Sequence, residues 1–162
     1  MIFFSTESFR KSLALLLKAK REEYASIKSD IVTLFFGKTP DAIFSSPDMV
    51  RIEREFKIIK IRMPNSGSKL SKRDGYRLIY LINSKKSIVC LFYVYPKTGS
   101  LRQINISDSD LKKYLEEFIN DFSSKTLVCH DLTRELSINN KGSCMIETCE
   151  YEQISCMEGM QK

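Results

Sequence analysis

Three short runs of β-branched and aromatic residues lie in the middle of the chain, and they constrain its fold more than any other feature. They cover residues 58–63, 76–82 and 88–95, and this composition is typical of β-strands. A turn-forming residue follows each run. Because the connection over 83–86 is short enough for a hairpin, the sequence predicts adjacent antiparallel strands.

Helical patterns flank these runs. Apolar residues recur at helical spacing over 9–17 and 24–35, and Gly37 ends the second pattern. After the strands, Ser107 and Asp110 have the spacing of a capping box. The apolar stripe that follows predicts a helix packed on the sheet. This stripe consists of Leu111, Tyr114, Leu115, Phe118, Ile119 and Phe122.

These patterns predict one α+β domain over residues 1–124. We expect two N-terminal helices and a C-terminal helix, packed on a small, mainly antiparallel sheet. Residues 2–4 predict a short first strand before a helix cap at Ser5 and Thr6. Segment 38–48 contains Pro40 and Pro47, and we expect it to be a loop.

Residues 125–162 carry no sustained periodicity, and we expect a cysteine-containing, flexible tail. A zinc site formed by Cys129, His130, Cys144 and Cys149 is the alternative, but their spacing lacks the paired C-x-x-C pattern. The N-terminus has no basic flank like that of a signal peptide, and no stretch of the chain is apolar enough for a membrane span. We therefore expect a cytoplasmic protein with reduced thiols and no contact with a membrane.

Positive charge is concentrated in the strand region. Residues 51–102 hold 13 lysine and arginine residues against 3 acidic ones, a net charge of +10, whereas the other 110 residues sum to −4. A concentrated positive field captures polyanions, which favours nucleic acid as the partner. A solvated basic surface that only aids solubility is the alternative.

The cations follow the strand periodicity. Lys60 and Arg62 are two residues apart, so a strand places both on one face and turns its neighbouring apolar side chains to the other. Arg77 stands in an otherwise apolar strand, where it binds a phosphate, pairs with a carboxylate such as Asp74, or lies at a sheet edge. The loop between these two strands adds Lys69, Lys72 and Arg73.

The end of the third strand combines aromatic and basic residues. Tyr95 precedes Lys97, and Arg102 follows shortly after. Aromatic rings stack on bases and cations bind phosphates, so this grouping is typical of a protein that holds single-stranded RNA. For any single tyrosine, packing in the core is the alternative.

The composition of the basic region also limits its chemistry. His130 is the one histidine of the chain and lies outside this region, and the acidic residues between 51 and 102 are only Glu53, Glu55 and Asp74. We therefore expect neither a metal nor another cofactor. Cleavage in which RNA supplies its own 2′-hydroxyl, with lysine and arginine neutralising the charge on the phosphate, remains open.

The sequence resembles the RelE/ParE toxin superfamily. The resemblance rests on residues 59–62, the Gly/Ser/Lys loop after them, residues 75–80, the hairpin, and residues 94–97. The long loop 64–74 and the residues 105–107 before the final helix are most similar to HigB-type toxins.

This resemblance implies a toxin of a toxin–antitoxin pair that enters the ribosomal A site and cleaves mRNA without metal. It implies a helix-turn-helix antitoxin as the protein partner. By position, the catalytic cations would be Lys60, Arg62, Arg77 and Lys97, and RNA contacts would come from Lys69, Lys72, Arg73, Tyr95 and Arg102.

One departure concerns tyrosine. RelE carries a tyrosine in its C-terminal segment, whereas residues 103–106 read Gln-Ile-Asn-Ile here, with no tyrosine before Tyr114. Because fold alone does not fix function, two alternatives remain: a ParE-like protein that inhibits DNA gyrase and cuts nothing, and a non-catalytic binding module that descends from a toxin.

Overall fold

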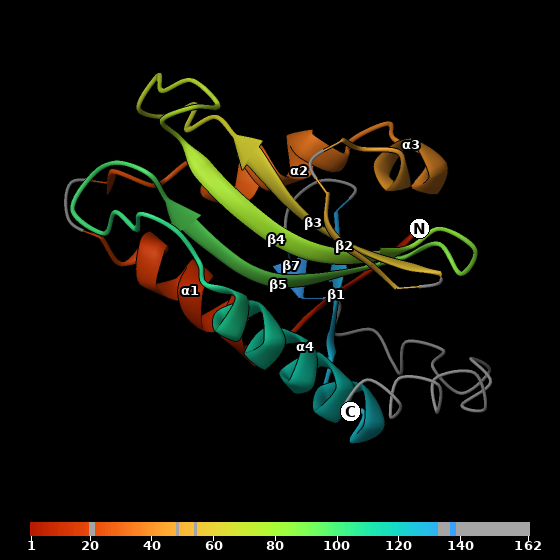
Figure 1. Ribbon diagram of the computed structural model, residues 1–162. Coiled ribbons are helices and arrows are strands. Elements are labelled where there is room, and N and C mark those ends of the chain that lie inside the picture. Colours follow the sequence, from red (N-terminus) through yellow and green to blue (C-terminus); the bar gives the residue numbers. More distant parts are fainter. Residues whose placement is uncertain (20–21, 48, 54, 133–136, 139–162) are drawn as a thin grey trace.

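The computed structural model describes residues 1–19, 22–47, 49–53, 55–132 and 137–138. They form an α+β fold around a seven-stranded sheet of order β2-β3-β4-β5-β1-β6-β7 (Figure 1). The strands are β1 (Ile2–Ser5), β2 (Met49–Glu53), β3 (Phe56–Met63), β4 (Tyr76–Asn83), β5 (Ile88–Pro96), β6 (Val128–Asp131) and β7 (Ser137–Ile138). β1 runs parallel to β5, and every other neighbouring pair in this sheet is antiparallel.

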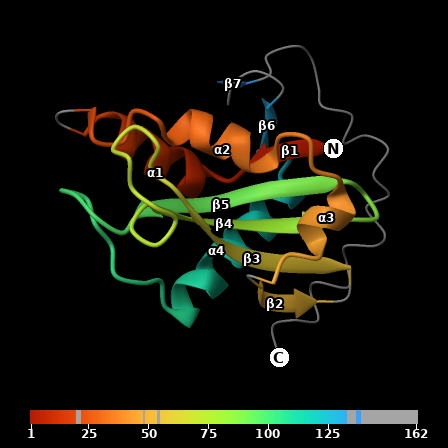
Figure 2. The same ribbon diagram turned by 90° about the horizontal axis from the view of Figure 1, so that it is seen from above.

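Helices cover both faces of the sheet, and each face has its own apolar core. The helices are α1 (Glu7–Leu17), α2 (Ile27–Phe35), α3 (Pro40–Phe44) and α4 (Asp108–Ser123). α1, α2 and α3 pack on one face, where Phe9, Ile31 and Ile43 join the core. α4 packs on the opposite face with Phe118 (Figure 2). Burial on both faces explains why β4 is an almost continuous apolar run, except at Arg77.

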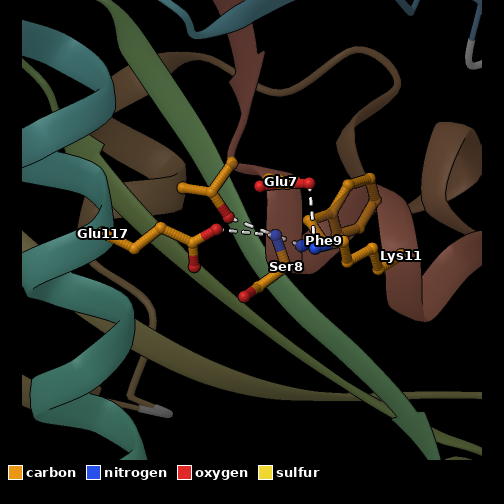
Figure 3. A network of polar contacts seen from close by, with 6 residues as sticks. Glu7, Ser8, Phe9, Lys11 and Glu117 are labelled. Atoms are coloured by element: carbon orange, nitrogen blue, oxygen red, sulfur yellow. Dashed lines mark hydrogen bonds and ion pairs between the residues drawn. The ribbon is translucent and has the colours of Figure 1, made fainter. Parts of the chain in front are cut away.

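The ends of the helices are fixed by polar contacts. Thr6 caps α1 by accepting from the backbone N–H of Phe9. Ser107 and Asp110 form a reciprocal capping box at the start of α4. From α4, Glu117 Oε1 accepts a hydrogen bond of 2.8 Å from the backbone N–H of Ser8 in the first turn of α1 (Figure 3). The N–H groups of the first turn of a helix have no partners within the helix. The Glu117 carboxylate accepts from one of them and so connects α4 to α1.

Several sequence predictions are confirmed. The three central runs form β3, β4 and β5, and the 83–86 connection joins β4 to β5 as an antiparallel hairpin. The first strand, both N-terminal helices, the capping box and the final helix are present. The α+β class and the mainly antiparallel sheet are therefore as predicted.

Segment 38–48 contradicts the prediction of a loop. It contains the short helix α3, in which Pro40 occupies the first turn and Thr39 accepts from the backbone N–H of Ala42. Proline is favourable at this position because its missing N–H would have no helical partner there. The following strand β2, which pairs with β3, was not predicted.

The predicted domain end at Ser124 is also wrong. β6 lies beside β1, so that β1 is an internal strand with neighbours on both sides. Leu127 and Leu132 are buried on opposite faces, and His130 Nε2 lies 2.6 Å from the hydroxyl of Ser5. The fold therefore continues at least to residue 132, and residues 139–162 of the expected tail lie outside the described residues. Among the helices of the described chain, none is long and apolar enough to cross a membrane.

Candidate nucleic-acid interface

Adjacent strands bring three predicted cations onto one face of the sheet. Arg62 of β3 lies directly opposite Arg77 of β4, and Arg77 lies opposite Tyr95 of β5. Lys60 is two residues before Arg62, so it shares this face with them. It is the face that carries α4, because Ile58 and Tyr95 belong to the core beneath that helix.

The cations occupy only one end of this face. Ile58 and Phe56, two and four residues before Lys60, join the core under α4, so only the Lys60–Arg62 end of this face of β3 is cationic. Arg62 is exposed and Lys60 is half-buried. Within the described parts of the chain, no ion pair or hydrogen bond of the Arg62 side chain is present.

Lys97 reaches the same end of the sheet from the loop after β5. Its Nζ donates to the carbonyl of Ile104, while Lys60 Nζ donates to Oδ1 of Asn105 over 3.1 Å. The segment between β5 and α4 is thus bonded to both lysines. We call Lys60, Arg62, Arg77 and Lys97 the basic face.

Arg77 is held by backbone carbonyls. One terminal nitrogen donates to the carbonyls of Lys72 and Tyr76, both at 3.0 Å, and the other donates to the carbonyl of Arg73 at 2.9 Å. Three of the five N–H groups of the guanidinium are therefore used to shape the loop before β4. Arg77 links the position of Lys72 and Arg73 to the sheet.

The loop between β3 and β4 carries Lys69, Lys72 and Arg73, and all three are exposed. Close packing fixes the base of this loop, because a Cβ on Gly75 would lie 2.3 Å from the carbonyl oxygen of Met63. Buried Asp30 of α2 fixes its start by accepting from the backbone N–H of Ser66. The loop therefore presents three cations from an anchored frame.

Tyr95 does not have the predicted role. Its side chain is 3% exposed and belongs to the core under α4, so it cannot stack on a base. Half-buried Tyr93 is stacked on Tyr114 of α4, with ring centroids 5.0 Å apart and planes 16° apart. The chain thus has a tyrosine of its final helix close to the basic face, although its spacing in the sequence indicates only a core residue.

Burial sets the protonation of these tyrosines. It raises the pKa of Tyr93, with a further increase from the charge of Asp110. Burial is also the main reason for the raised pKa of Tyr114. The pKa of Tyr95 is raised by burial as well, against an opposite effect of the Arg77 charge. All three are therefore neutral near pH 7, and the raised pKa makes each a weaker acid than an ordinary tyrosine.

The described residues contain no group of three or more histidine, cysteine, aspartate or glutamate side chains that could hold a metal ion. Cys129 and His130 are neighbours on β6 and face opposite sides of the sheet, since Cys129 packs toward α4 and His130 lies against Phe9 of α1. Cys144 and Cys149 lie outside the described residues.

Arg102 is exposed in the loop after β5, and its backbone N–H donates to the carbonyl of Gly99. It lies next to the segment that bonds to Lys60 and Lys97. Lys60, Arg62, Arg77 and Lys97 therefore lie at the same end of the sheet, with an exposed cationic loop beside them. No protein-family model, curated protein or solved structure matches this chain.

Proposed function

We propose that the protein binds single-stranded RNA through the basic face and cleaves it as a metal-independent endoribonuclease. The observation that supports this best is the direct pairing of Arg62 with Arg77 on neighbouring strands. Like charges at opposite positions of a sheet are destabilising. A polyanion that binds between them removes this repulsion, so the arrangement favours phosphate binding over a purely structural role.

The chemistry we propose is attack by the RNA itself. The 2′-oxygen attacks the adjacent phosphorus and loses its proton to solvent, while the bond from phosphorus to the 5′-oxygen breaks and leaves a cyclic phosphate. Lys60 and Arg62 would stabilise the charge on the phosphate, and Lys97 would give a proton to the leaving oxygen. The resemblance implies catalytic cations at these positions, and the division of roles among them is our proposal.

The biological setting we propose is also that of the resemblance. The described element order begins with a strand and two helices, continues through a three-stranded antiparallel meander and ends that part of the chain with a helix on the opposite face. This order supports a RelE-like toxin of HigB type that inhibits translation by cutting mRNA in the ribosomal A site. Its partner would be a helix-turn-helix antitoxin in the cytoplasm. Relative to that pattern, α3, β2, β6 and β7 are additions.

Two observations favour a binding module without catalysis. Arg77 donates three N–H groups to backbone carbonyls, and Tyr95 is buried in the core. Two of the predicted site residues therefore stabilise the fold. Such a protein would bind RNA through Lys60 and Arg62 and leave it intact. A cleavage assay separates the two functions.

Binding is tested with a short single-stranded RNA by fluorescence anisotropy across a salt series. Arg62→Gln should weaken binding and reduce the slope of log K against log salt by about 0.7, the value for one phosphate contact to a single strand. Lys28→Gln is the matched control, because it removes the same charge from an exposed position on α2, on the other side of the sheet. Equal effects of the two variants would mean that the basic face is not the binding site.

Cleavage is tested by inducing the protein in bacteria and mapping message ends. We expect cuts in a translated message and none in the same message without a start codon. Intact messages together with normal supercoiling would favour the binding module. Intact messages with loss of supercoiling would favour the gyrase inhibitor.

A further inference from the structure

The segment between β5 and α4 bonds to two cations of the basic face by uncharged groups. Asn105 supplies its side-chain oxygen to Lys60, and Ile104 supplies its main-chain carbonyl to Lys97. Neither lysine has an ion pair with an acidic residue among those the structure describes, whereas Lys85 in the β4–β5 hairpin pairs with Glu55. The two ammonium groups are thus held in place and keep their charge.

The segment is fixed at both ends. The backbone N–H of Gln103 donates to the carbonyl of Pro96 over 2.9 Å, and Gln103 Oε1 accepts from the hydroxyl of Tyr93. Ile106 is buried under α4, and Ser107 begins the capping box directly after it. Asn105 therefore lies between two anchored points.

A held lysine differs from a mobile one in its binding energetics. The lysine side chain has four rotatable carbon–carbon bonds, and fixing it on binding costs conformational entropy. A neutral acceptor orients the ammonium without neutralising it and uses one of its three N–H groups. The other two N–H groups of the ammonium can donate to phosphate oxygens.

We propose that Asn105 is a positioning residue that holds the Lys60 ammonium ready for a phosphate of single-stranded RNA. The carbonyl of Ile104 does the same for Lys97, so that both charges are directed at one stretch of RNA backbone. This inference rests on the proposed RNA binding and goes beyond it by assigning a function to an uncharged residue. Asn105 itself does not touch the reacting atoms.

Asn120 of α4 provides a matched control. Its side chain is exposed, and the hydrogen bonds described for this residue use its main-chain carbonyl, which substitution leaves in place. Asn120→Ala should therefore bind RNA like the wild type, although it makes the same change of side chain. Asn105→Ala removes the acceptor of Lys60 and leaves every charge unchanged.

The test is a double-mutant cycle on the full chain, with Kd for a short single-stranded RNA as the readout. Asn105→Ala should raise Kd about 3- to 10-fold, in the range for one ordinary hydrogen bond. The slope of log K against log salt should stay unchanged, because the number of phosphate contacts is the same. In a Lys60→Ala background, Asn105→Ala should have no effect. Asn105→Asp should restore the bond but lower the salt slope, since it neutralises Lys60.

Three results would overturn the inference. They are wild-type affinity in Asn105→Ala, an equal loss of affinity in the Lys60→Ala background, and an equal loss in Asn120→Ala. Melting temperatures check that the variants fold, and an exposed Asn105 leads us to expect little change. If the wild-type protein binds no RNA, the proposed function is wrong and this inference falls with it, whereas wild-type binding with an inert Asn105→Ala refutes the inference alone.

Discussion

Truncation of the chain after Ser124 should destabilise the fold strongly, although the sequence indicates a dispensable tail there. The deletion removes Leu127 from the core under α4 and Leu132 from the core under α1 and α2. Burial of a leucine side chain contributes about 1.5–3 kcal/mol, so the two together contribute about 3–6 kcal/mol. β6 also pairs with three residues of β1, and net stabilisation of about 1 kcal/mol per hydrogen bond adds about 2 kcal/mol.

The expected loss is therefore about 5–8 kcal/mol, which is comparable with the whole stability of a typical domain. Urea denaturation followed by circular dichroism compares chains that end at residues 124, 138 and 162. The chain 1–138 keeps β6 and β7 and is the control for deletion of residues 139–162. We expect it to unfold cooperatively, and we expect 1–124 to be unfolded or to have a much lower urea midpoint.

If 1–124 cannot be purified, point variants of the full chain carry the same test. Leu127→Ala and Leu132→Ala should each lower the free energy of unfolding by about 2–3 kcal/mol. Leu15→Ala is the control, because that leucine on α1 is 57% exposed. A chain 1–124 within about 1 kcal/mol of 1–138 would refute the reasoning, since it would mean that β6 adds nothing to the sheet.

Three further predictions concern single residues. Ser107→Ala should lower the free energy of unfolding by about 1 kcal/mol in urea denaturation. Hydrogen bonds from Ser107 hold the pKa of Asp110 low, so this pKa should rise in an NMR titration of the variant. An unchanged pKa would contradict the capping box. Gly75→Ala should lower the free energy of unfolding by about 1–3 kcal/mol, because its Cβ would meet backbone atoms at the end of β3. Gly67→Ala should lower it less, because its Cβ would meet only the side chains of Ser26 and Asn65. Equal melting temperatures of the two variants would contradict this reasoning. Burial raises the pKa of Tyr114 above its ordinary value of 10.0. The contribution of Tyr114 to stability should therefore be constant below that pH and be lost as the pH rises above it. Tyr114→Phe should reduce the fall in stability between about pH 9 and pH 11 in urea titrations, and an identical fall in both proteins would contradict the burial argument.

Much of the fold follows from local patterns. β3, β4 and β5 could be predicted because their apolar runs are too short for helices and are followed by turn-forming residues. The capping box at Ser107 is readable because both of its members lie within four residues. The strands that the sequence missed depend on distant partners instead. β6 is a strand because it pairs with the edge of β1, which lies more than 120 residues earlier in the chain. A local sequence pattern contains no information on that pairing.

The candidate site divides in the same way. The shared face of Lys60 and Arg62 follows from strand alternation and is confirmed. The burial of Tyr95 depends on α4, which lies on it from a later part of the chain, and so the sequence could not separate a core tyrosine from a base-stacking one. The partners of Arg77 are main-chain carbonyls, which every residue has, so sequence has no means of identifying them.

The internal position of β1 has a consequence for the order in which the chain folds. The contact of Thr6 with Phe92 spans 86 residues and that of Ser5 with His130 spans 125. Contacts of such separation close large loops and slow folding, so we expect refolding in milliseconds to seconds, with the β4–β5 hairpin forming first. During synthesis at roughly 5–20 residues per second, His130 is made at least about 6 s after Ser5. During that interval β1 lacks β6, its neighbour on one side. The cationic strands β3 and β4 are therefore synthesised before the sheet is complete.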